Sequence, residues 1–270
     1  MKKTILALPY VVWMAIFIIV PLLLVVGYAF TTRTGGFTLD NFSTMLEYTP
    51  IFTRSFGLAF TATVICLVIA YPLAYILSQR EISHQSLYIT LLMLPMWMNF
   101  LLRTYAWMSI LENKGFINRF LDLIGLPTVT LINTPFAIVL GMVYNYLPFM
   151  VLPIYTVMIK IDKRLIEAAQ DLGANSATVF RRVLFPLSLP GVLSGITMVF
   201  VPGVSTFVIS NLLGGGKNMM VGDLIEKQFI GAAYNPYLGS AIALVMMVLI
   251  FICMWIVDRF TDDSSQGVIM

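Results

Sequence analysis

Charged side chains that could bind or react gather in one segment of this 270-residue chain, at residues 162–186. The segment reads DKRLIEAAQDLGANSATVFRRVLFP and separates two long apolar runs. Glu167 and Asp171 are four residues apart, so a helix would place them on one side. No histidine accompanies them, because the single His84 lies in another polar loop, where we expect it to be solvated. The segment therefore suits contact with another surface better than catalysis.

Two other patterns suggest chemistry, but neither meets the residue requirements of the site that it suggests. The stretch GGGK at 214–217 suggests a phosphate-binding loop, but that motif needs a glycine five residues before the Gly-Lys pair and Ser or Thr after it. Asn211 and Asn218 occupy those positions, so we expect a flexible turn and no bound ATP. Cys66 and Cys253 lie inside apolar runs and are expected to be small buried residues, with no metal and no disulfide.

The elements that position these residues are expected to lie in lipid. The chain is 59% hydrophobic and 11% charged, with a mean hydropathy of +0.92. An average soluble domain is about 25% charged, and a soluble fold could not cover this much apolar surface. The net charge of +3 indicates no nucleic-acid surface. We predict an all-α membrane protein with a single domain over residues 1–270.

Six apolar runs are long enough to cross a bilayer, which takes about 20 residues. They are 5–30, 56–77, 87–102 continued by 104–111, 135–159, 187–213 and 238–257. Only Arg103 interrupts the third run. The first run exceeds the apolar region of a signal peptide, so we expect an uncleaved helix. A short surface helix is expected at 39–46, with Asp40 and Asn41 at its start.

Basic residues indicate the orientation, because Lys and Arg are enriched in cytoplasmic loops. The six spans place both termini on one side. Of the 16 Lys and Arg residues, nine fall on that side, and five of these nine lie in the 160–186 loop. We therefore predict that both termini and the 160–186 loop are cytoplasmic.

The 160–186 loop has the local signals of two short helices. Asp162 can cap a helix over 163–172, which Gly173 would end. The spacing predicts one apolar face on this helix, made of Leu165, Ile166, Ala169 and Leu172. Asn175 or Ser176 would cap a second helix at 177–185, which Pro186 would stop. The same residues also suit an ordinary amphipathic loop lying on the membrane.

The 160–186 loop resembles the cytoplasmic signature of ABC importer permeases, which reads EAA, three residues, Gly, nine residues and I-x-L-P. Here Glu167-Ala168-Ala169, Gly173 and Val183-Leu184-Phe185-Pro186 stand in register, with Val for Ile and Phe for Leu. The stretches 93–107, 144–162 and 211–225 are similar to the spermidine/putrescine branch of that family. The likeness covers nearly the whole chain.

The resemblance implies a type I, MetI-like importer fold, with a permease core at about 55–258 and the loop as a coupling helix. It implies a bacterial inner or plasma membrane location. The implied partners are a dimer of ATP-hydrolysing subunits, a second similar permease and an extracellular or periplasmic polyamine-binding protein. ATP and Mg would sit on the ATPase, with no cofactor on this chain. The residues implied to contact the ATPase are Leu165, Glu167, Ala168, Ala169, Asp171 and Gly173.

A polyamine is a flexible cation, which carboxylates and aromatic faces hold best. The spans contain no acid, so we expect a weak path built from rings and amides near helix ends, with two acids at the outer mouth: Trp97, Asn99, Tyr105, Tyr144, Asn145, Asp223 and Glu226. The aromatic residues also suit an interfacial belt, and both interpretations stay open. Arg103 opposes a cation-attracting vestibule unless an acid such as Glu112 pairs with it.

Other functions remain as alternatives. Importers of iron, sulfate or another small solute would carry the same loop. A secondary transporter or channel is less favoured, because that class commonly shows intramembrane charges or broken-helix ion sites. A membrane enzyme is least favoured, because the spans contain no catalytic set of His, Asp, Glu and Ser.

Overall fold

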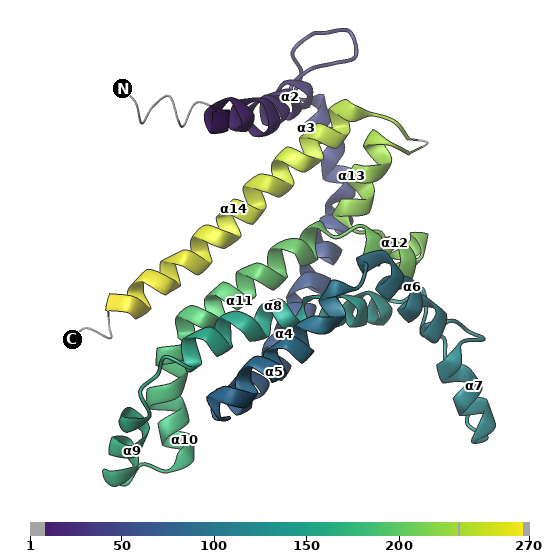
Figure 1. The fold of residues 1–270 in the computed structure, drawn as a ribbon. Helices are drawn as coiled ribbons and strands as arrows, with labels where there is room; N and C mark the ends of the chain where they lie inside the picture. The colour runs from purple at the N-terminus through teal and green to yellow at the C-terminus, as the bar shows by residue number, and fades with distance from the viewer. Residues whose placement is uncertain (1–8, 232, 267–270) are drawn as a thin grey trace, which may run out of the picture.

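The chain folds as a bundle of helices, seen in a computed structural model that describes residues 9–231 and 233–266 (Figure 1). Five helices in that part are long and apolar enough to cross a membrane, and they number six when one bent pair is counted as a broken span. Within the described residues, extended pairing is limited to a single bridge between Thr31 and Phe37. The predicted all-α class with six spans is therefore confirmed.

The spans lie close to the predicted runs. The long helices are α2 (Val20–Ala29, continuous with helical turns from Pro9), α4 (Thr49–Ser78), α8 (Pro135–Met158), α11 (Phe185–Ser205) and α14 (Pro236–Gln266). Residues 5–8 of the predicted first helix lie outside the described residues. The surface helix expected after Asp40 is present as α3 (Asp40–Met45).

The third span is broken, whereas the sequence predicted a run interrupted only by Arg103. Helix α5 (Ile82–Met93) ends in a 3₁₀ turn at Leu94–Trp97, and α6 (Phe100–Leu111) follows at a bend of 83°. Asn99 starts the second half, since its side chain accepts the N–H of Leu101 at 2.8 Å. The chain therefore turns at Met98–Asn99, and Arg103 lies inside α6.

The fifth span is present, but it runs over Ser176–Ser205, so the predicted end of this run at residue 213 was wrong. Helix α11 ends at Ser205, Thr206 is extended, and α12 (Val208–Gly214) restarts the helix. The N-terminus of α13 (Val221–Phe229) packs into this break. A β-carbon on Gly222 would stand 2.5 Å from the carbonyl oxygen of Thr206. This contact comes from a segment that is distant in the sequence, so local signals do not reveal it.

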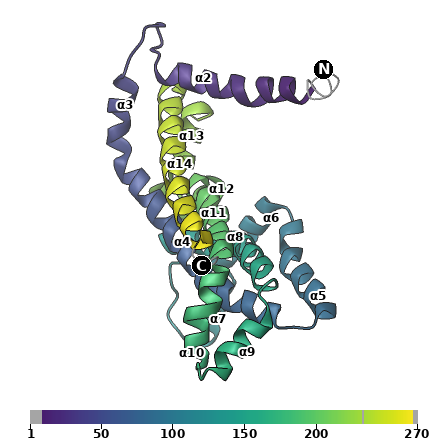
Figure 2. The ribbon, with the colours of Figure 1, turned by 90° about the vertical axis from the view of Figure 1, so that its left-hand side faces the viewer.

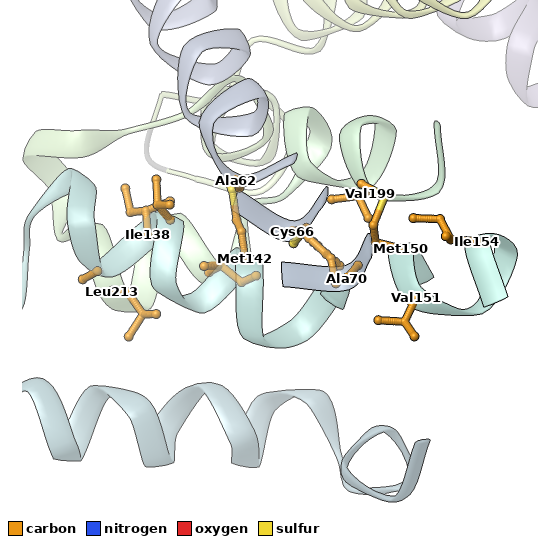
Figure 3. Packing of buried hydrophobic residues seen from close by; sticks show 14 of the residues in the cluster. Ala62, Cys66, Ala70, Ile138, Met142, Met150, Val151, Ile154, Val199 and Leu213 are labelled. Atoms are coloured by element: carbon orange, nitrogen blue, oxygen red, sulfur yellow. The ribbon is translucent and has the colours of Figure 1, made fainter. Parts of the chain in front are cut away.

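Helices α4, α8 and α11 form the packed centre of the bundle (Figure 3). Ala62, Cys66, Ala70 and Ala74 recur every four residues along α4 and are fully buried. Small residues on one face let helices approach closely in lipid, where packing replaces the hydrophobic effect as the driving force. The expectation of a buried Cys66 is confirmed, while Cys253 is half-buried.

The two ends of the bundle carry different elements (Figure 2). At one end lie α3 and α13, and α2 extends sideways from it. At the opposite end lie α9 (Lys163–Asp171) and α10 (Ser176–Val179), which belong to the 160–186 loop. We call these the α13 end and the α9 end. The 160–186 loop thus projects from the bundle on the side away from α13.

Candidate functional site

Helix α9 forms as its sequence predicts. The side chain of Asp162 accepts the N–H of Arg164 at 3.0 Å and caps the first turn. Gly173 ends the helix with φ +83°, a left-handed conformation that glycine adopts without steric cost. The N–H of Ala174 then bonds to the carbonyl of Ala169 at 3.0 Å, which closes the turn. The glycine corner between the two short helices is therefore confirmed.

The second helix begins as expected but does not stop at Pro186. Asn175 accepts the N–H of Thr178 at 2.9 Å and caps α10. A π-helical turn, Phe180–Leu184, then joins α10 directly to α11. Proline lacks an N–H, but membrane helices tolerate it because neighbouring groups satisfy the carbonyl that it leaves free. The loop therefore enters the membrane span as one continuous helical path.

The residues of the predicted apolar face of α9 differ in exposure. Ile166 and Ala169 are half-buried, and Ile166 lines a small cavity with Met158 and Leu184. Leu165 is 50% exposed and Leu172 is 90% exposed. Two leucines on a short helix, left exposed by the described residues, favour docking on another surface.

The remaining residues predicted to contact an ATPase are accessible. Glu167, Ala168, Asp171 and Gly173 are exposed. An open hollow of about 430 Å³ lies between the two short helices, and its lining includes Leu172, Gly173, Thr178 and Arg182. The structure therefore brings the six predicted contact residues together on one projecting element.

The predicted substrate-path aromatics are only partly brought together. Of these, Tyr144 meets the ring of Trp107, a further aromatic residue of α6, edge to face with centroids 5.4 Å apart. Trp97 and Tyr105 are exposed, and within the described part of the chain neither makes a ring contact. Asn99 serves as the cap of α6. An interfacial belt and a cation path both remain compatible with this arrangement.

Two predicted path residues are buried and incompletely paired. Asn145 is 2% exposed, and its Nδ2 donates to the carbonyl of Gly141 at 2.8 Å. Asp223 is 3% exposed and accepts the N–H of Met220 at 2.8 Å. Among the described residues, Oδ1 of each side chain has no hydrogen-bond partner. Burial raises the pKa of the Asp223 carboxyl above its usual range.

Asp223 and Glu226 lie on α13, which packs mainly against α14, whereas Trp97 and Tyr105 lie around α6. Glu226 is half-buried. Arg103 is 7% exposed, and within the described residues it makes no ion pair with Glu112 and its Nε has no partner. The described residues contain no group of His, Cys, Asp and Glu that could hold a metal ion.

Gly214 and Gly215 of the GGGK turn at 214–217 are closely packed, which corrects the expectation of a flexible turn for these two residues, while Gly216 has open space around it. The N–H of Asn133 bonds to the carbonyl of Leu213 at 2.9 Å, and Asn218 Nδ2 donates to the carbonyl of Asn133 at 2.8 Å. Gly215 has φ +52° and lies directly against the Asn133 side chain. These glycines therefore allow a close backbone approach between two segments at the α13 end.

Sequence reasoning missed a polar contact at the α9 end. The hydroxyls of Tyr71 in α4 and Ser188 in α11 are 2.8 Å apart. Each is a polar residue within an apolar run, which is a signal that it bonds to another helix. The sequence does not identify the partner, because the two residues are 117 positions apart.

Comparison with known proteins places this architecture among transporters. Residues 38–264 match the family model described as "Binding-protein-dependent transport system inner membrane component". The chain is 36% identical to the spermidine/putrescine transport system permease protein PotB of Escherichia coli K12, covering 94% of this chain and 97% of that protein. It is 35% identical to PotB of Haemophilus influenzae, covering 92% and 90%.

Solved structures share the fold at low identity. A bacterial ABC transporter that imports the acidic polysaccharide alginate has a TM-score of 0.78 at 17% identity, covering 97% of this chain and 95% of that one. The MetNI methionine ABC transporter has a TM-score of 0.60 at 18% identity, covering 82% and 98%. These similarities support the predicted type I importer fold.

Proposed function

Because this chain belongs to the family of binding-protein-dependent transport system inner membrane components, we propose that it is the permease subunit of an importer for spermidine and putrescine. It is an inner-membrane transport protein whose helices form half of a translocation pathway. The observation that carries the mechanism is the projecting α9, with Leu165 and Leu172 exposed. The likeness to PotB over nearly all of the chain supports the substrate.

The proposed mechanism needs partners. The 160–186 loop docks on a separate ATPase subunit in the cytoplasm, and this ATPase holds ATP and Mg. A second permease completes the pathway, and a periplasmic or extracellular binding protein delivers the polyamine at the α13 end. Both chain termini are then cytoplasmic. A related alginate transporter has been solved with its ligand-bound periplasmic protein, which supports a delivery partner of this kind.

The geometry explains how docking would move the bundle. Helix α9 is capped at Asp162 and closed at Gly173, so it moves as a rigid unit. The ATP-bound and empty ATPase must hold this unit with different contact energies, since a ligand shifts an equilibrium only by its differential affinity. The displacement then passes through the continuous helical path into α11.

The pathway itself is proposed to bind polyamine weakly. Trp97, Tyr105 and Tyr144 would offer ring faces to the amines, and Asn99 and Asn145 would offer amide oxygens. Asp223 and Glu226 would attract the cation at the α13 end. A weak path suits an importer whose binding protein supplies the affinity, because tight binding within the membrane would slow release.

The test is uptake by the complete transporter in proteoliposomes. We expect ATP-dependent uptake of labelled spermidine, and loss of that uptake with Glu167→Lys while the variant remains in the membrane. Pull-down of the ATPase should weaken with the same change. The matched control is Glu81→Lys, which reverses the charge of an exposed acid beyond the end of α4. Uptake of sulfate or iron in place of spermidine would contradict the substrate, and normal uptake by Glu167→Lys would contradict the docking role.

A further inference from the structure

A three-ring cluster joins α4 to the root of the 160–186 loop. The Tyr71 ring lies edge-on to Phe180, with centroids 5.5 Å apart, and tilted to Phe185 at 6.2 Å. Phe180 and Phe185 are 6.3 Å from each other. Beyond the rings, the Tyr71 hydroxyl reaches the Ser188 hydroxyl at 2.8 Å. One side chain of α4 therefore contacts three residues of the path that leads from α10 into α11.

The direction of the hydrogen bond follows from its neighbours. Ser188 Oγ donates to the carbonyl of Phe185 at 3.1 Å. Its single proton is used there, so the Tyr71 hydroxyl donates to Ser188 Oγ. Ser188 is fully buried and Tyr71 is half-buried. A donor and an acceptor in an apolar surrounding hold their orientation, because losing either partner leaves a buried polar group unpaired.

The cluster spans the π-helical turn. The N–H of Phe185 bonds to the carbonyl of Phe180, five residues back, which defines the turn. A π turn holds one more residue than an α turn, and such turns often lie at functional sites. Converting it to α-helix would rotate the preceding segment by about 100° around the helix axis. Tyr71 contacts the residues at both ends of this turn, Phe180 and Phe185, and these contacts favour the π-helical state over the α-helical state.

A second hydrogen bond between side chains joins helices at the same end. The Tyr155 hydroxyl of α8 donates to Gln85 Oε1 of α5 at 2.9 Å. The centre of the bundle, by contrast, is packed by apolar side chains of α4, α8 and α11. Directional bonds at the α9 end therefore set helix rotation where the loop enters the membrane.

We propose that Tyr71 is a positioning residue for coupling: through Ser188 and the two phenylalanines it holds the π turn and passes the displacement of α9 and α10 to α4. This inference rests on the proposed importer function. It places no ligand on Tyr71, which acts through the turn. If Tyr71 only fills space, Tyr71→Phe keeps the rings, loses one hydroxyl and leaves coupling unchanged.

The experiment uses the complete transporter in proteoliposomes and measures movement directly. Spin labels at Ala177 and Phe251 report the loop, and labels at Val68 and Phe251 report α4; all three positions are exposed, and none belongs to the predicted ATPase contact residues. Cys253→Ser removes a background thiol, and Cys66 is fully buried. ATP binding should change both distances in the parent protein. In Tyr71→Phe and in Ser188→Ala the loop distance should still change, while the α4 change is lost.

Transport supplies the second readout. We expect Tyr71→Phe and Ser188→Ala each to lower spermidine imported per ATP hydrolysed by about 2- to 10-fold, the range for one neutral hydrogen bond. The double variant should be no worse than either single one. Tyr75→Phe is the matched control, since Tyr75 lies one turn further along α4 and its hydroxyl makes no hydrogen bond to any described residue.

The outcomes separate the two proposals. The positioning role would be overturned if ATP still changed the Val68–Phe251 distance in Tyr71→Phe. It would also be overturned if Tyr71→Phe and Tyr75→Phe lowered the spermidine imported per ATP hydrolysed by the same factor. Spin-label distances do not depend on the substrate, so they test Tyr71 even if the parent complex imports another solute. Absence of spermidine uptake by the parent complex would contradict only the proposed function.

Discussion

Gly191 of α11 lies so close to α8 that a β-carbon on it would stand 2.7 Å from the carbonyl oxygen of Pro153. This distance is shorter than any relaxed contact, and the neighbour is backbone, which cannot rotate away. The central pair of helices therefore depends on a residue without a side chain at this crossing. In the proposed mechanism this crossing would receive the loop's displacement, because α11 begins where the 160–186 loop ends.

The first prediction concerns this crossing. Gly191→Ala should destabilise the protein by about 1–3 kcal/mol, the usual cost of overpacking a core. Gly57→Ala is the control, because Gly57 lies in α4 with open space around it. That change should be neutral or stabilise by up to about 1 kcal/mol, as alanine favours helix. Thermal unfolding in detergent measures both, and equal midpoints for the two variants would contradict the close packing.

The second prediction concerns the glycine corner of the loop. Gly173→Ala places a β-carbon at φ +83°, which costs about 1–2 kcal/mol in a left-handed conformation. We expect a distorted corner and reduced ATP-dependent uptake, with ATPase pull-down weakened. Gly125→Ala is a strain-matched control, because Gly125 has φ +75° and open space but follows α7 (Phe116–Leu123), away from the loop. If both variants lose uptake equally, strain alone explains the loss.

The third prediction separates a polyamine path from an aromatic belt. Trp97→Ala and Tyr144→Ala should each lower spermidine uptake by about 2- to 5-fold if their rings bind the cation, the effect of one exposed cation–π contact. Trp255→Ala removes an exposed ring of α14 and should leave uptake unchanged. Membrane levels of all three proteins serve as the assembly check. Unchanged initial rates for Trp97→Ala and Tyr144→Ala would leave these residues as belt residues.

The fourth prediction concerns the buried carboxyl of Asp223, whose pKa burial raises. Between the ordinary and the raised pKa, the folded protein holds a proton that the unfolded chain has released. The free energy of unfolding therefore falls as pH rises through this range, and it levels off above the raised pKa. Asp223→Asn keeps an acceptor for the N–H of Met220 and removes this dependence.

The measurement is the unfolding midpoint of both proteins between about pH 4 and pH 8. The difference between them isolates Asp223, since other titrating groups act equally in both. Asp223→Asn should be the more stable protein near neutral pH. Parallel pH profiles would show that the buried carboxyl titrates normally. Reduced spermidine uptake by the same variant, with stability retained, would support a role for Asp223 in attracting the cation.

Local features were readable from the sequence alone. The lengths of the apolar runs predicted six spans, because a helix needs a set number of residues to cross hydrocarbon. The caps at Asp162 and Asn175 and the corner at Gly173 were also readable, since each acts on a backbone group within three residues. The contact residues Leu165 to Gly173 could be named because they lie on one short element.

Tertiary structure decided what those local features do. It broke the third span near Asn99, ended α11 at Ser205 inside the predicted run, and left Leu165 and Leu172 of the predicted apolar face exposed. It also chose Ser188 as the partner of Tyr71. Each of these outcomes depends on segments far apart in the chain that meet only after folding. Hydrophobic runs and caps are properties of a single continuous segment, whereas helix pairing is selected by the fit of surfaces from separate segments.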